Sequence, residues 1–280
     1  KLINQEDNNI KPVRYEEEKI DLCENTVNFT GDTYVEWGVS SFSTINEYSE
    51  GKFIRDLDYD AIDKENEEIE ENKRKFTIFN FPGGVKTGNC WHKIFEELNF
   101  QAEEDKINEI VREKLGLFNL ITSEEEDPLR KQKIDAVENM VDNVLNTKLT
   151  KYGLYLRDIS ERNKISEMEF SLSIDNTVDK QSLTKLFQKY GYNIELENQI
   201  PRGMLKGFID LIFRDQGKYY IVDWKSNKIA NSYEQYTKQN ISNEMTEHNY
   251  TLQYLLYTIA LIKHLKDRVG AVNYDKIFGG

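Results

Sequence analysis

Residues 203–227 read GMLKGFIDLIFRDQGKYYIVDWKSN, and they carry the clearest structural pattern of the chain. β-branched and aromatic residues dominate both of its arms, which favours extended strands. The arms are separated by DQG at residues 215–217, a sequence typical of a tight turn. The segment is therefore predicted to be a β-hairpin.

Three charged side chains are predicted to meet at one end of this hairpin. Residues two apart in a strand share a face, so Asp223 and Lys225 point the same way while Trp224 points the other way. Asp210 ends the apolar run GFID of the first arm and can reach the same end of the sheet. The sequence thus predicts two carboxylates and an ammonium group side by side at the edge of an apolar layer.

Such a cluster suits a hard divalent cation, because Mg²⁺ prefers oxygen ligands from carboxylates, water and substrate phosphate. The metal would polarise a phosphoryl oxygen and lower the pKa of a bound water, and the lysine would orient that water and stabilise the developing charge. Phosphodiester hydrolysis uses all of these parts. The alternative interpretation is a surface ion pair between Asp223 and Lys225, with Asp210 at a strand end.

Three further candidates lie on predicted helices. His92 belongs to residues 87–100, where apolar residues recur at helical spacing, and it is either a core histidine or a ligand. Gln253 and Tyr257 are four residues apart on an amphipathic helix predicted near residues 247–266, so they share one face. Their amide and phenol could contact a phosphate or a base, or they could be ordinary residues of that face.

Two polar stretches indicate the domain organisation. Residues 1–36 are predicted to be a linker from a preceding region, and residues 37–280 to be one domain. Within that domain, residues 55–75 are dense in charge and predict an exposed acidic loop. Because the chain begins with Lys and not Met, we expect it to be a fragment of a longer protein.

The remaining patterns predict an α/β arrangement. Alternating apolar and polar residues at 167–174 are typical of a half-buried strand. Helical patterns occur over residues 103–116, 127–149 and 179–190. The first two of these join the helix that contains His92 to form a helical region at 87–150.

Composition narrows the class of protein. Of the 280 residues, 38% are hydrophobic and 12% aromatic, which is enough for a folded core. Two cysteines cannot supply a four-thiolate zinc or iron–sulfur site or a disulfide framework, so a reducing, cytoplasmic location is expected. No apolar run approaches the roughly 18 residues of a membrane span, so no membrane partner is expected.

Charge is unevenly distributed along the chain. The net charge is −13, which at first sight argues against a nucleic-acid partner. However, residues 1–80 carry 10 basic and 20 acidic side chains, whereas residues 181–280 carry 13 and 10. The acidic first part is either a solvated surface or a segment that contacts a basic partner subunit.

Four stretches together resemble one known family. They are FPGGVKTGNCWHKIFEELNF at 81–100, EMEFSLSI at 167–174, the hairpin with Arg202, and TLQYLLYTIALIKHLKDRVGAVNYDKIFGG at 251–280. They resemble the C-terminal nuclease domain of bacterial exodeoxyribonuclease V beta subunits, within the PD-(D/E)xK nuclease superfamily. The resemblance implies a restriction-endonuclease-like fold, a mixed sheet flanked by helices. The family normally continues with another strand and helix, so we expect the C-terminal end of the domain to be truncated.

The resemblance also implies roles for individual residues. His92, Asp210 and Asp223 match the metal ligands, and Lys225 matches the catalytic lysine that acts with Asp210 and Asp223. Glu167 falls at a further active-site glutamate, with Glu169 as the alternate. The family's Q-x-x-x-Y motif, expected to bind substrate, is matched by Gln253 and Tyr257.

The function implied is a Mg²⁺-dependent deoxyribonuclease that hydrolyses unwound DNA during double-strand-break resection and recombinational repair. Mn²⁺ is expected to substitute for Mg²⁺, and Ca²⁺ to be an inert occupant. The implied partners are single-stranded DNA, the helicase and other subunits of a hetero-oligomeric helicase–nuclease, and a strand-exchange recombinase. The alternative is a catalytically inactive module of the same fold that binds DNA or docks the recombinase. Retention of every acid and of the lysine argues against that alternative.

Overall fold

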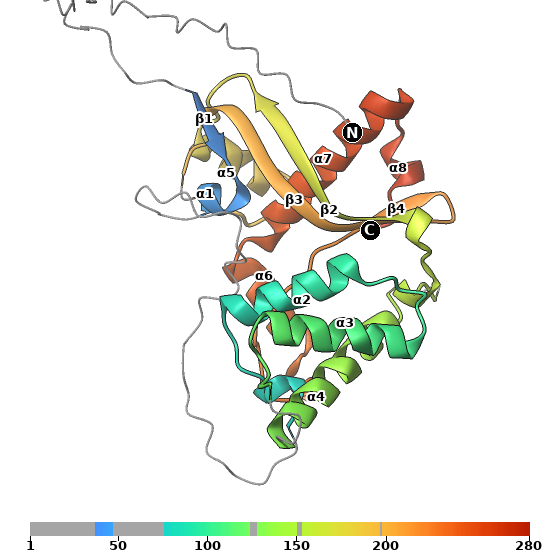
Figure 1. The fold of residues 1–280 in the computed structure, drawn as a ribbon. Coiled ribbons are helices and arrows are strands. Elements are labelled where there is room, and N and C mark those ends of the chain that lie inside the picture. Colours follow the sequence, from blue (N-terminus) through green and yellow to red (C-terminus); the bar gives the residue numbers. More distant parts are fainter. Residues whose placement is uncertain (1–36, 47–75, 124–127, 150–152, 197) are drawn as a thin grey trace, which may run out of the picture. The chain divides into compact units, whose positions relative to one another are not determined.

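A four-stranded mixed sheet forms the centre of the computed structural model, which describes residues 37–46, 76–123, 128–149, 153–196 and 198–280 (Figure 1). The long strand β3 (Arg202–Asp215) pairs antiparallel with β2 (Lys164–Ile174) on one side. On its other side, β1 (Trp37–Ser40) runs parallel to the first residues of β3 and β4 (Lys218–Val222) runs antiparallel to the last. The predicted α/β fold with a mixed sheet is thereby confirmed.

The predicted hairpin is present as β3 and β4, with two differences. Its turn contains only Gln216 and Gly217, because Asp215 still pairs with Lys218. Both turn residues have positive φ, 45° and 81°, as a two-residue hairpin turn of type I′ requires. The second strand ends at Val222, so Asp223 to Lys225 lie just beyond it and not within a strand as predicted.

Helices cover both faces of the sheet (Figure 1). The helices and 3₁₀ turns are α1 (Phe42–Asn46), η2 (Ile78–Asn80), α2 (Val85–Glu97), α3 (Glu104–Leu117), α4 (Pro128–Leu145), η3 (Leu156–Asp158), η4 (Glu161–Asn163), α5 (Lys180–Lys189), η5 (Tyr233–Gln235), α6 (Lys238–Glu247), α7 (Tyr250–Val269) and α8 (Tyr274–Ile277). The predicted helical region is confirmed as α2, α3 and α4, although α4 ends four residues earlier than predicted. The predicted helix near residues 247–266 is α7, which begins only at Tyr250 because Asn249 before it has a left-handed backbone with φ of 53°. A separate helix, α6, ends at Glu247.

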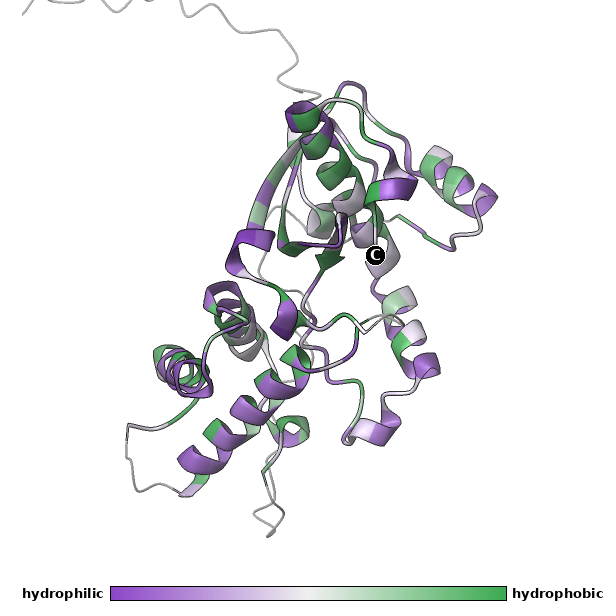
Figure 2. Cartoon of the chain, turned by 90° about the vertical axis from the view of Figure 1, so that its right-hand side faces the viewer, coloured by the Kyte–Doolittle hydropathy of each residue, from purple (hydrophilic) through white to green (hydrophobic). Residues whose placement is uncertain are grey.

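Two apolar cores result, one on each face of the sheet. The first packs α2, α3 and α4 against Leu211 and Phe213 of β3. The second packs α7 against β2 and against Leu205, Ile209 and Ile212 of β3. Figure 2 shows the corresponding pattern, in which green hydrophobic and purple hydrophilic residues alternate along the helices. Strand β3 therefore contributes to both cores.

Every second residue of β3 faces the same core, and this pattern shifts at Asp210. Ile209 packs into the second core, whereas Leu211, two residues later and on the same face of a regular strand, packs into the first core. The pairing with β2 continues across this point, since Ser166 still pairs with Leu211 and Met168 with Ile209. Asp210 thus lies at the boundary between the two cores.

The predicted linker at 1–36 and the acidic loop at 55–75 lie outside the described residues. The assignment of 37–280 as one nuclease domain stays a prediction. None of the described helices combines the length and apolar character that crossing a bilayer requires.

Candidate active site

Three side chains from three elements meet at the boundary between the cores. His92 comes from α2, Glu167 from β2 and Asp210 from β3. The Nδ1 of His92 lies 3.7 Å from the Oδ2 of Asp210 and 4.0 Å from the Oε1 of Glu167. Each residue offers one ligand atom, and these atoms lie within 4.8 Å of one another. One nitrogen and two carboxylate oxygens at this spacing can hold a divalent cation.

Glu167 reaches the cluster through an unusual backbone conformation. Its φ is +50°, in the left-handed region that residues other than glycine rarely adopt, although both neighbours on β2 pair regularly with β3. Such a conformation costs on the order of 1–3 kcal/mol and is found where the surrounding structure enforces it. Glu169, in a regular part of the strand, is solvent-exposed. The structure therefore brings Glu167, and not the alternate Glu169, to His92.

His92 is oriented by the backbone that follows β4. Its Nε2 lies 3.0 Å from the carbonyl oxygen of Trp224. A carbonyl can only accept a hydrogen bond, so Nε2 carries the proton in this contact. In the neutral ring the lone pair is then on Nδ1, the atom that faces Asp210 and Glu167. A backbone contact of this kind fixes the tautomer that a metal-binding histidine needs.

Asp210 is a buried acid with only 7% of its surface exposed. Burial raises its pKa well above the ordinary value, and the nearby Asp223 carboxylate raises it further. His92, the backbone N–H of Trp224 and Lys225 act in the opposite direction. A cation bound here would favour the ionised carboxylate.

Asp223 and Lys225 form an ion pair at the end of the hairpin, with Oδ2 and Nζ 2.8 Å apart. Between them, Trp224 turns to the other side and stacks on Phe95 of α2, with ring centroids 4.4 Å apart and an angle of 23° between the planes. The predicted alternation therefore persists beyond the end of the strand. The stacked Trp224 attaches this segment to the first core.

Gln253 of α7 contacts both Asp223 and Tyr257. The Nε2 of Gln253 donates a hydrogen bond to the Oδ1 of Asp223 at 3.0 Å and another to the Tyr257 hydroxyl oxygen at 2.8 Å. Both side chains are buried. This contact positions the Asp223 carboxylate, and the prediction that the pair binds substrate stays a prediction.

Two contributors to the site are not predicted from the sequence. The backbone of Trp224 supplies the carbonyl that contacts His92 and the N–H that contacts Asp210, and no side-chain pattern reports such a role. The second is Tyr250, whose ring lies 4.5 Å from the Nζ of Lys225. Its position three residues before Gln253, on the same face of α7, was the available signal.

Comparison with known proteins identifies a nuclease family and several similar bacterial proteins. A family model described as "PD-(D/E)XK nuclease superfamily" matches residues 74–276. The chain is 36% identical over 251 residues to the RecBCD enzyme subunit RecB of Escherichia coli strain K12, covering 87% of this chain and 20% of that protein. It is 29% identical over 273 residues to the subunit of the same name from Haemophilus influenzae, covering 90% of this chain and 21% of that protein. The chain thus spans about a fifth of the length of these curated relatives.

Proposed function

The chain belongs to the PD-(D/E)XK nuclease superfamily, whose reaction is phosphodiester hydrolysis, and we propose that it is the DNA-cleaving domain of a helicase–nuclease that acts in recombinational repair. One observation carries the proposal: His92, Glu167 and Asp210 converge on one point. The ion pair of Asp223 and Lys225 follows on the same short segment whose backbone contacts both His92 and Asp210.

We propose that His92, Asp210 and Asp223 hold Mg²⁺, with Glu167 as a further acid of the site. Nucleases of this superfamily generally use a divalent metal ion, and the donor set of one imidazole and several carboxylates also suits Mn²⁺. When bound by these residues, a divalent ion would supply Lewis acidity toward a phosphoryl oxygen and would lower the pKa of a water molecule. The chain's part is to keep Nδ1 of His92 unprotonated and to bring the carboxylates of Glu167 and Asp210 close to it.

Lys225 is proposed to act on the attacking water and on the charge that develops on the phosphate. Its ammonium group is held by Asp223, and Asp223 is in turn held by the Gln253 amide. This chain of contacts fixes the ammonium group before substrate arrives, so little reorganisation is needed in the transition state. Gln253 is thus a positioning residue for Asp223 in this proposal.

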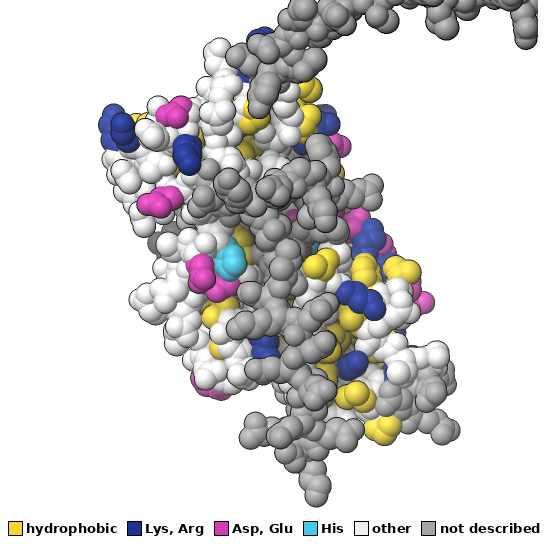
Figure 3. Space-filling model, turned by 90° about the vertical axis from the view of Figure 1, so that its left-hand side faces the viewer, with side chains coloured by type: hydrophobic (Ala, Val, Ile, Leu, Met, Phe, Trp, Pro, Cys, Tyr) yellow, Lys and Arg dark blue, Asp and Glu magenta, His cyan; other side chains and the backbone are white. Residues whose placement is uncertain are grey.

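The proposed substrate is an unwound DNA strand delivered by partner subunits. The relatives are named as subunits of a RecBCD enzyme, which supports an assembly of several subunits. A net charge of −13 repels the phosphate backbone at long range, and salt confines this repulsion to roughly 8 Å. On the face drawn in Figure 3, Lys and Arg side chains lie among hydrophobic ones and could hold a strand once it is close.

Incubation of the chain with labelled single-stranded DNA and Mg²⁺ tests this proposal. We expect cleavage that stops when the metal is chelated and that is lost in Asp223→Asn, with unchanged thermal stability. Absence of metal-dependent cleavage, with DNA binding retained, would instead support the catalytically inactive module. Retention of His92, both aspartates and Lys225 in one site argues against that alternative.

A further inference from the structure

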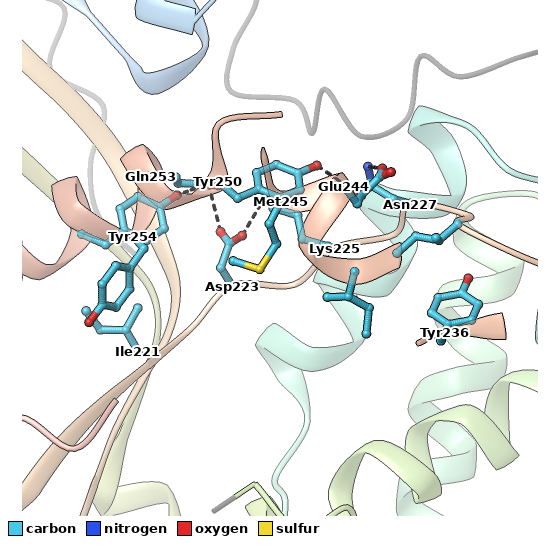
Figure 4. Close-up of a pocket in the computed structure, with 13 residues that line it drawn as sticks. Ile221, Asp223, Lys225, Asn227, Tyr236, Glu244, Met245, Tyr250, Gln253 and Tyr254 are labelled. Atoms are coloured by element: carbon cyan, nitrogen blue, oxygen red, sulfur yellow. Dashed lines mark hydrogen bonds and ion pairs between the residues drawn. The ribbon is translucent and has the colours of Figure 1, made fainter. Parts of the chain in front are cut away.

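A pocket of about 360 Å³ opens next to the Asp223–Lys225 ion pair (Figure 4). It lies between the end of the hairpin, α6 and the first turns of α7. Its walls are predominantly apolar and aromatic, and they include Tyr236, Ile241, Met245, Tyr250 and Tyr254. Its volume is at the lower end of the roughly 300–1,000 Å³ typical of small-ligand sites, which suits a single planar group.

The pocket is surrounded by apolar side chains that reach solvent. Ile241 is 40% exposed, Met245 is 42% exposed and Tyr254 is 38% exposed. Single exposed hydrophobic residues are common, but a group of them around one hollow marks a binding surface. The side chains of α6 and α7 drawn in Figure 4 face the same space as Asp223 and Lys225.

Polar groups at one side of the pocket are held in fixed positions. The Nδ2 of Asn227 donates to the Oε1 of Glu244 at 2.7 Å, and the Tyr250 hydroxyl donates to the Oδ1 of Asn227 at 3.1 Å. Gln253 also lines the pocket, and its buried Oε1 has no hydrogen-bond partner in the part of the chain that the structure describes. Amide and carboxylate groups such as these pair with the donors and acceptors on base edges.

We propose that this pocket receives one unpaired nucleobase of the DNA strand, adjacent to the phosphate that is cut. The proposal rests on the proposed function, because it assumes a DNA strand at Asp223 and Lys225. These two residues line the pocket and belong to the candidate active site, so an occupant of the pocket is a near neighbour of the reacting phosphate. Aromatic rings bind bases of any sequence by stacking.

The pocket would also select for single strands. A base inside a duplex is stacked on both faces and paired along its edge, so it can enter a side pocket only after unpairing. An unwound strand has already lost that pairing, and no unpairing energy is then required. The base pocket, and not the ion pair, would therefore discriminate between single- and double-stranded DNA.

Tyr236→Ala is the direct test, and Tyr233→Ala is its matched control. Tyr233 is a tyrosine three residues earlier, is 79% exposed and does not line the pocket. Tyr236→Phe keeps the ring. Met245→Ala, at an exposed position on α6, provides a second variant should Tyr236→Ala prove unstable. The probes are a labelled single-stranded oligonucleotide and a set of the same oligonucleotide with one abasic residue moved along the strand.

We expect Tyr236→Ala to weaken binding of the intact oligonucleotide by about tenfold, as loss of one stacked base implies. Tyr233→Ala and Tyr236→Phe should bind like the wild type. An abasic residue at one position should weaken binding by the wild type by a similar factor. It should not further weaken binding by the Tyr236→Ala variant. In cleavage, KM should rise while kcat at saturating DNA stays within about twofold.

Three results would overturn the base pocket. The first is an equal loss of DNA affinity in Tyr236→Ala and Tyr233→Ala. The second is that Tyr236→Ala weakens binding of intact and abasic DNA by the same factor. The third is unchanged DNA affinity in both Tyr236→Ala and Met245→Ala. The last result would indicate that the pocket receives an apolar group of a partner protein. The wild type could also show weaker binding when the abasic residue is at one position and yet cleave no DNA. That result would overturn the proposed nuclease function and leave the base pocket intact.

Discussion

The backbone N–H of Trp224 donates a 2.6 Å hydrogen bond to the Oδ2 of Asp210. This bond joins the segment after β4 to the middle of β3, and the carbonyl of the same Trp224 contacts His92. A single peptide segment therefore sets the distance between the buried acid and the histidine.

Lys225→Ala is expected to reduce the rate of single-stranded DNA cleavage by well over tenfold, because the ammonium group that stabilises the developing charge is lost. Tenfold corresponds to about 1.4 kcal/mol of transition-state stabilisation. Lys228→Ala, at an exposed position three residues later, is the matched control and should cleave like the wild type. A Lys225→Ala variant with wild-type thermal stability and more than about a tenth of the normal rate would disprove the role of Lys225.

His92→Ala should weaken Mn²⁺ binding by at least about tenfold, because it removes the one nitrogen ligand of the cluster. Titration calorimetry with Mn²⁺ measures this directly. His264→Ala, a half-buried histidine of α7 outside the cluster, serves as the control. Unchanged Mn²⁺ affinity in His92→Ala would assign His92 a purely structural role in the first core.

Glu167→Gly should leave the free energy of unfolding unchanged or raise it, since glycine adopts a φ of +50° without strain. The same variant should lose cleavage activity, because the carboxylate is gone. Glu169→Gly is the control, since it lies in the same strand with regular pairing and should destabilise the protein by about 1 kcal/mol. Equal destabilisation of the two variants in urea unfolding would show that no strain is stored at Glu167.

Asp210→Asn should make the metal-free protein more stable at neutral pH. The folded-state pKa of Asp210 is raised, so between the unfolded value near 4 and the folded value the native state binds more protons. Wild-type stability should therefore fall as pH rises through this window, and Asp210→Asn should remove that part of the decline. Urea unfolding with chelator at several pH values measures the difference, and parallel profiles for the two proteins would contradict it.

The hairpin, β2 and the helices α2 to α4 could be predicted because their patterns are local. Alternation over residues 167–174 and the DQG turn are visible within short windows. The positive φ of Glu167 could not be predicted, since no residue preference indicates it and only the pairing on both sides enforces it. The contact between Trp224 and His92 was also inaccessible, because 132 residues separate them and only the packing of α2 on the sheet brings them together.

The change of alternation at Asp210 has a consequence for cooperativity. The segment before this residue is anchored in the second core alone, whereas the segment after it also contacts the first core through Leu211 and Phe213. His92 belongs to α2, which packs in the first core. Opening of α2 to α4 alone would separate His92 from Asp210 while β2, β3 and α7 stayed folded. Metal binding at the proposed site should then be lost on mild denaturation before the sheet signal, so it would report on the docking of α2 against the sheet.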